Sequence, residues 1–185
     1  RFSLKAGDAC GVIGPSGAGK SSLGKALIGI WPAVQGHVRL DGSALDQWAE
    51  AIRGQYVGYL PQTVELLEGT VAQNISRFDP DGQINPEAMS ERVIAAARTA
   101  GVHDLIIGLP QGYDTPVGPG GETLPGGQCQ RIGLARALFG DPFLVVLDEP
   151  NSNLDAEGDK ALEGAILAIR ARGGRAEAAV LDVTD

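Results

Sequence analysis

The segment that most constrains the fold is a glycine-rich run made of Gly14, Pro15, Ser16, Gly17, Ala18, Gly19, Lys20 and Ser21. It satisfies every fixed position of the pattern G-x-x-x-x-G-K-[ST]. An apolar stretch at 8–13, which we interpret as a strand, precedes it, and a helical pattern at 21–30 follows. Strand, glycine-rich loop and helix in this order are what a phosphate-binding loop requires.

Each residue type in this run has a chemical reason. Glycines let successive backbone N–H groups turn toward phosphate oxygens, and the following helix adds the positive end of its dipole. Lys20 supplies a cation for β- and γ-phosphates, the Ser21 hydroxyl is suited to Mg²⁺, and Ser22 completes the predicted ATP-binding set. The alternative, a glycine-rich turn without function, is disfavoured by the strand and helix on either side.

Two acids follow the apolar run at 143–147, and we interpret that run as a central parallel strand covered on both faces. Ligands bind at the carboxyl ends of such strands. We predict that Asp148 holds Mg²⁺ and that Glu149 acts as general base toward the attacking water. The acids would alternatively only end a strand and cap the next helix. A phosphate loop in the same domain favours the catalytic interpretation.

Composition limits the class of protein. The chain of 185 residues fits one domain, and a net charge of −8 disfavours nucleic-acid binding. Cys10 and Cys129 stand far apart, which argues against a disulfide framework and for a reducing, cytosolic compartment. No apolar run approaches the roughly 18 residues of a membrane-spanning helix.

The rest of the chain predicts an α/β fold, with a P-loop NTPase core around a parallel sheet and a helical subdomain inserted in it. We assign 1–62 and 141–185 to the core, and 63–140 to the helical subdomain with the helix that closes it. Further strands are predicted at 37–40, 56–60 and 178–183, and further helices at 87–100, 128–139 and 159–172.

Three further motifs occur in a fixed order. They are Tyr59-Leu60-Pro61-Gln62, Leu124-Pro125-Gly126-Gly127-Gln128 and Ser152-Asn153-Leu154-Asp155. With the phosphate loop and acidic pair, they make the chain resemble the ATP-binding domain of ABC transporters, which is a RecA-like P-loop fold, over essentially its whole length. The resemblance implies that these motifs are the Q-loop, the signature and the D-loop.

The resemblance also implies roles for single residues. Gln62 contacts Mg²⁺ and the attacking water, so the catalytic set is Glu149, Gln62 and Lys20. The metal set is Ser21, Gln62 and Asp148. The signature residues Pro125, Gly126, Gly127 and Gln128 face the ATP of a partner domain, and Asp155 belongs to the D-loop. Two such domains then enclose two ATP molecules head to tail.

Other stretches resemble exporters. Residues 69–75 are similar to the exporter segment GTVxENI, which meets the membrane domain, and 113–118 are similar to YDTxVG. Residues 31–42, 45–48 and 148–155 resemble type I secretion ATPases, which export proteins such as proteases from Gram-negative bacteria. This implies as partners the transmembrane domain of the same transporter, a second ATP-binding domain, and membrane fusion and outer-membrane proteins. It places the domain, with ATP and Mg²⁺, at the cytoplasmic face of the inner membrane.

The chain also departs from the family pattern. Pro125 replaces the signature Ser, Pro119 replaces a Glu, and no histidine follows the last predicted strand; the two histidines, His37 and His103, are predicted to lie at the surface. We expect the chain to be an excerpt of a longer one that binds Mg-ATP weakly and hydrolyses it slowly. A transporter motor, a degenerate ATP-binding module without turnover, and an ABC ATPase acting on DNA or ribosomes are the competing functions.

Overall fold

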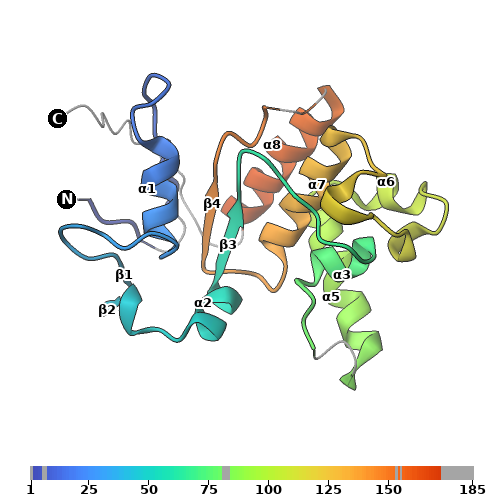
Figure 1. Ribbon diagram of the computed structural model, residues 1–185, viewed down its shortest axis with the longest axis horizontal. Helices are drawn as coiled ribbons and strands as arrows, with labels where there is room; N and C mark the ends of the chain where they lie inside the picture. Colours follow the sequence, from blue (N-terminus) through green and yellow to red (C-terminus); the bar gives the residue numbers. More distant parts are fainter. Residues whose placement is uncertain (1, 6–7, 81–83, 153, 155, 172–185) are drawn as a thin grey trace.

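The computed structural model describes residues 2–5, 8–80, 84–152, 154 and 156–171. The strands are β1 (Arg39–Leu40), β2 (Ser43–Ala44), β3 (Val57–Leu60) and β4 (Leu144–Leu147). The α-helices are α1 (Lys20–Leu27), α2 (Glu50–Tyr56), α3 (Val71–Ile75), α5 (Pro86–Thr99), α6 (His103–Ile107), α7 (Gly126–Leu138) and α8 (Ala156–Ala171). Short 3₁₀ turns are η1 (Leu45–Gln47), η2 (Gly112–Asp114) and η3 (Pro119–Gly121). In Figure 1, β3 and β4 stand between α1 on one side and α7 and α8 on the other.

The two longer strands form a parallel pair, as the apolar run at 143–147 predicted. Their register runs from Val57 opposite Leu144 to Leu60 opposite Leu147. Helix α7 packs closely on β3, because a Cβ on Gly58 would collide with the carbonyl oxygen of Ala137. Only glycine permits this approach of backbone to backbone. The arrangement fixes the signature helix directly against the strand that leads into Gln62.

The expected strand at 8–13 is not present as a strand, and this part of the sequence-based prediction was wrong. No ladder hydrogen bond joins it to β4 in the part of the chain that is described. A cavity of about 690 Å³ is lined both by this segment and by β4. Because β4 faces this cavity, all four of its residues are half-buried, whereas the sequence predicted a strand covered on both faces.

Several boundaries also differ from the prediction. The strand expected at 37–40 is reduced to β1, which pairs with β2 across a turn at Asp41 and Gly42, both with positive φ (52° and 83°). Tyr56 ends α2 and does not begin β3. The strand expected at 178–183 and the end of the helix expected at 159–172 lie outside the described residues.

Most of the hydrophobic core lies among helices α3, α5, α6 and α7. Its fully covered side chains include Val71, Ile75, Val102, Ile106 and Ile132. Burying each such side chain contributes about 1.5–3 kcal/mol relative to leaving it exposed. This part of the chain therefore has its own packed interior, which positions the start of α7.

Helix α3 is short, and its stability depends on its ends. Thr70 and Gln73 form a capping box: the Thr70 hydroxyl accepts from Gln73 N–H at 3.1 Å, and Gln73 Oε1 accepts from Thr70 N–H at 2.8 Å. The buried Asn74 side chain bonds both the N–H and the carbonyl of Leu67, at 2.8 and 2.9 Å. These contacts fix the segment that follows Gln62.

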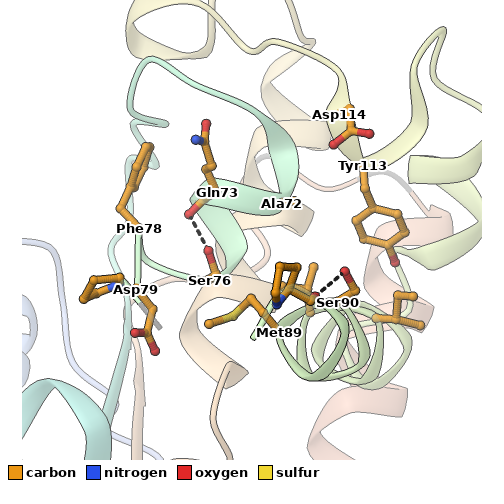
Figure 2. A pocket seen from close by; sticks show the side chains of 13 residues that line it. Ala72, Gln73, Ser76, Phe78, Asp79, Met89, Ser90, Tyr113 and Asp114 are labelled. Atoms are coloured by element: carbon orange, nitrogen blue, oxygen red, sulfur yellow. Dashed lines mark hydrogen bonds between the residues drawn. The ribbon is translucent and has the colours of Figure 1, made fainter. Parts of the chain in front are cut away.

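The two exporter-like stretches lie side by side. Val71 N–H donates to the carbonyl of Thr115 at 3.1 Å, and Val117 N–H donates to the carbonyl of Gly69 at 2.9 Å. Beside them a pocket of about 520 Å³ opens between α3, α5 and η2. Figure 2 shows Phe78, Met89 and Tyr113 around it. Among the described helices, none is long and apolar enough to cross a bilayer.

Candidate functional site

The glycine-rich loop at 14–21 folds back on itself directly before α1. Ala18 N–H donates to the carbonyl of Pro15 at 3.2 Å and closes the turn. Gly17 and Gly19 have φ angles of 83° and 91°, which residues with a Cβ rarely adopt. A Cβ at either position would meet no atom within 4 Å, so glycine is needed here for backbone conformation and not for space.

Lys20 is the first residue of α1, and its side chain turns back over the loop. Its ammonium group donates to the carbonyl oxygens of Gly14 and Pro15, at 3.0 Å each. The first N–H groups of α1 have no partner within the helix, and they carry the positive end of its dipole. A lysine cation beside a helix N-terminus is an arrangement that binds anions, phosphate in particular.

The loop and the acidic end of β4 meet at one point. Ser21 Oγ donates to Asp148 Oδ1 at 3.0 Å. Asp148 is held there by its own N–H, which donates to the Leu60 carbonyl at 2.9 Å and continues the β3–β4 ladder by one residue. A hydroxyl and a carboxylate side by side present the hard oxygen ligands that Mg²⁺ prefers.

Gln62 and Glu149 form the second contact of the site. Gln62 Nε2 donates to Glu149 Oε2 at 2.7 Å, so the ends of β3 and β4 each supply one side chain. Glu149 has a φ of 47°, a left-handed conformation that costs about 1–3 kcal/mol in a residue with a side chain. Ser152 N–H donates to the Glu149 carbonyl at 3.1 Å and closes this strained turn. Backbone strain of this kind is common at active sites.

Tyr59 adds a polar group that the sequence did not mark as functional. Burial, and secondarily the negative charge of Asp148, raises the pKa of its phenol. Its hydroxyl is buried and has no hydrogen-bond partner among the described residues. Tyr59 therefore stays neutral beside the acidic strand end.

The signature residues form the start of α7, as expected. Pro125 is the N-cap residue, and its carbonyl accepts from the N–H groups of Gln128 and Cys129 at 2.9 and 3.1 Å. No side chain caps this end of the helix. Pro125 and Gly126 are exposed, so the N-terminal end of α7 can be reached by a ligand from outside.

The structure thus brings together the phosphate loop with Lys20 and Ser21, the acids Asp148 and Glu149, and Gln62. Ser22 is exposed in the first turn of α1. Within the described residues, no hydrogen bond links these groups to Pro125, Gly126, Gly127 or Gln128. Asp155 and the region after 171 lie outside the described residues. His37 is exposed, whereas His103 is half-buried and bonds the Tyr113 hydroxyl at 2.9 Å.

Sequence reasoning missed a polar residue beside the site, Gln130, and another at the opposite end of β3, Arg77. Gln130, 2% exposed, donates from Nε2 to the Pro150 carbonyl at 3.3 Å. Arg77 donates to the carbonyls of Val57, Arg136 and Ala137 and to that of Gly54. A signal existed for Gln130, because a polar residue four positions before Leu134 lies on the apolar face of the helix. Arg77 lies in a turn, where the sequence has no hydrophobic periodicity that could have indicated its role.

Comparison with known proteins agrees with these features. The sequence profile described as "ABC transporter" matches residues 1–152. The chain is 63% identical over 173 residues to the type I secretion system ATP-binding protein PrsD of Rhizobium meliloti (strain 1021), covering 94% of this chain and 29% of that protein. It is 40% identical over 169 residues to the human mitochondrial potassium channel ATP-binding subunit, covering 89% of this chain and 22% of the relative.

A solved structure is also similar. The structure of a bacterial Atm1-family ABC exporter with ATP bound superposes with a TM-score of 0.79 at 30% sequence identity. The match covers 97% of this chain and 30% of that one. The chain therefore spans less than a third of the length of the relatives that it matches.

Proposed function

Since this chain belongs to the ABC transporter family and is an exporter-type ATP-binding domain, we propose that it is the ATP-hydrolysing motor of a type I protein secretion transporter. The observation that carries the proposal is the pair of contacts Ser21–Asp148 and Gln62–Glu149, at 3.0 and 2.7 Å. They join the phosphate loop, the acidic strand end and the Q-loop in one site. The identity to a type I secretion protein supports the subfamily.

We assign binding of the triphosphate to residues 14–22. Backbone N–H groups of the loop and of the α1 N-terminus receive phosphate oxygens, and Lys20 adds the positive charge. In the structure the Lys20 ammonium bonds carbonyls of its own loop, so ATP would exchange these contacts for stronger, charge-assisted ones.

Glu149 is proposed as the general base. Its carboxylate takes a proton from the water that attacks the γ-phosphorus, while the bond from that phosphorus to the β,γ-bridging oxygen breaks and ADP leaves. Gln62, which bonds Glu149 now, would orient the same water. Glu149 bonds Gln62 whereas Asp148 bonds Ser21, so the two acids have different partners and can serve different roles.

The residues at the site fit Mg²⁺. Ser21 Oγ and Asp148 Oδ1 are already adjacent, and Gln62 can add an amide oxygen. When bound, Mg²⁺ would neutralise charge on the β- and γ-phosphates. In this arrangement Asp148 would serve as a metal ligand and leave proton transfer to Glu149.

For the whole transporter we propose two contacts. The exposed start of α7 would face ATP in a second, head-to-tail copy of the domain, through Pro125, Gly126, Gly127 and Gln128. Residues 69–75 would meet the membrane domain at the cytoplasmic face of the inner membrane. Membrane fusion and outer-membrane proteins would complete a secretion system, as the similarity to a type I secretion protein supports.

The test is the substitution Glu149→Gln. A motor should lose about 10²–10⁴-fold in turnover while still binding ATP, because only the proton acceptor is removed. Steady-state phosphate release and retention of radiolabelled ATP measure the two properties. Glu163→Gln, an exposed acid on α8, is the matched control and should change neither. Equal turnover in Glu149→Gln and the unsubstituted chain would instead favour the degenerate ATP-binding module.

A further inference from the structure

We propose that Gln130 is a positioning residue that holds, from the signature helix, the strained turn carrying Glu149. Gln130 does not reach the reacting atoms, and it acts through the backbone of Pro150. The inference rests on the proposed role of Glu149 as general base, and it adds a residue that sets the position of that base.

The contact is built into the interior. Gln130 is 2% exposed, and its Nε2 donates to the Pro150 carbonyl at 3.3 Å. Pro150 itself has no N–H, so its carbonyl is its one backbone group that can form a hydrogen bond. The contact is partly buried, so leaving the Pro150 carbonyl without this donor would be unfavourable, and Gln130 therefore helps to fix where Pro150 lies. Glu149, directly before it, has the positive φ of 47°.

Helix α7, which carries Gln130, is held in place by close packing and hydrogen bonds. A Cβ on Gly133 would come within 2.7 Å of Val64 Cγ1, so the helix packs closely on the segment after Gln62. At the C-terminal end of α7, Arg77 donates to the carbonyls of Arg136 and Ala137, at 2.9 and 3.1 Å. Because α7 is held at its middle and at its C-terminal end, a rotation of the helix would displace Pro150.

These contacts close a ring through the site. Gln130 on α7 bonds the turn that carries Glu149, and Glu149 in turn bonds Gln62, which follows β3. At the start of β3, Arg77 bonds the carbonyls of both Val57 and Ala137 and so connects this strand to α7. The end of α7 that would face the partner's ATP is therefore connected to the general base of its own chain.

The first experiment is Gln130→Met, which keeps an unbranched side chain of similar length and removes the amide. We expect kcat to fall about 10- to 100-fold, because small displacements of a catalytic group have effects of this size. The Kd for Mg-ATP should change less than about twofold, since the phosphate loop is untouched. In a Glu149→Gln background, the same substitution should cause no further loss, because its effect passes through Glu149.

A second measurement does not depend on turnover. The N–H groups of Ser152 and Leu154 bond within the turn, to the carbonyls of Glu149 and Asn151. In Gln130→Met, hydrogen exchange of these two amides should accelerate at least about tenfold, while amides of α1 stay protected. Gln130→Glu, which keeps the shape, replaces the Nε2 donor by a carboxylate oxygen and adds a negative charge, should give the same result if Gln130→Met folds poorly.

The matched control is Ile132→Val, a buried position two residues along α7. It weakens packing without touching Pro150, so both kcat and the two amides should stay as in the unsubstituted chain. Unchanged exchange in Gln130→Met and Gln130→Glu would overturn the proposal, as would accelerated exchange with unchanged kcat. Failure of the proposed function is distinguishable, because then turnover would not depend on Glu149 even in the chain with Gln130 intact.

Discussion

Ser21 and Asp148 are separated by 127 positions in the sequence, yet the Ser21 hydroxyl donates to the Asp148 carboxylate at 3.0 Å. The contact joins the first turn of α1 to the end of β4. It follows from the order of elements, because the loop before α1 and the end of a parallel strand lie at the same edge of an open α/β sheet. In the proposed function, nucleotide binding and metal binding would therefore depend on this one junction.

Replacing Lys20 tests this junction from the side of the loop. Lys20→Ala removes the cation while leaving the loop backbone, so affinity for Mg-ATP should fall about 10- to 100-fold, the usual effect of losing a charge-assisted hydrogen bond. Equilibrium dialysis or a fluorescent ATP analogue measures the Kd. Lys160→Ala, an exposed lysine on α8, is the control. Unchanged affinity in Lys20→Ala would remove the basis for the assigned phosphate site.

The departure at Pro125 leads to a second prediction. Pro125→Ser supplies a hydroxyl where the family has one, and a Ser N-cap would also accept from the free N–H groups of α7. We expect turnover to rise about tenfold or more, because a donor to a charged oxygen in a transition state has effects of at least this size. The increase in turnover should be largest at high protein concentration, where two copies of the domain associate. Phosphate release is measured over a concentration series.

The control for that experiment is Pro86→Ser, at the exposed first position of α5. It makes the same chemical change at another helix start, remote from the site. A rise in both variants would point to a general effect on folding. No rise in Pro125→Ser would mean that the altered signature does not limit turnover.

The element types, and the meeting of the phosphate loop with the acidic strand end, were largely predictable from the sequence, for physical reasons. The glycine pattern fixed the loop before α1, and the apolar run before Asp148 predicted β4 and its parallel pairing. The prediction of a strand at 8–13 was wrong, since a strand needs a partner and an apolar stretch does not reveal whether one is present. Gln130 and Arg77 were missed because their contacts join segments that only the fold brings together.

Arg77 carries the third prediction, which concerns stability. Its guanidinium is half-buried, bonds four backbone carbonyls from α2, β3 and α7, and burial lowers its pKa. Arg77→Met should lower the free energy of unfolding by about 2–3 kcal/mol, because buried carbonyls lose their donor. Urea denaturation followed by circular dichroism measures this. Arg39→Met, an exposed arginine with one such bond, should cost less than about 0.5 kcal/mol.

The last prediction uses the two cysteines. Burial raises the pKa of the Cys129 thiol, which is 6% exposed and donates weakly to the carbonyls of Gly121 and Leu124. Only the thiolate reacts with iodoacetamide, so at pH 8 Cys129 should react at least about tenfold more slowly than the half-buried Cys10. Because the raised pKa belongs to the folded state, Cys129 favours folding below its ordinary pKa of 9.0 and this contribution is lost as pH rises further.

Mass spectrometry of tryptic peptides after timed alkylation gives both rates. In 8 M urea the two cysteines should react at similar rates, which is the internal control, since unfolding removes the burial that separates them. When the pH is raised from about 8 to about 10, the free energy of unfolding should fall less in a Cys129→Ala variant than in the unsubstituted chain. Alkylation of Cys129 as fast as that of Cys10 in the folded protein would show that the start of α7 opens readily, which contradicts a signature helix held rigidly against β3.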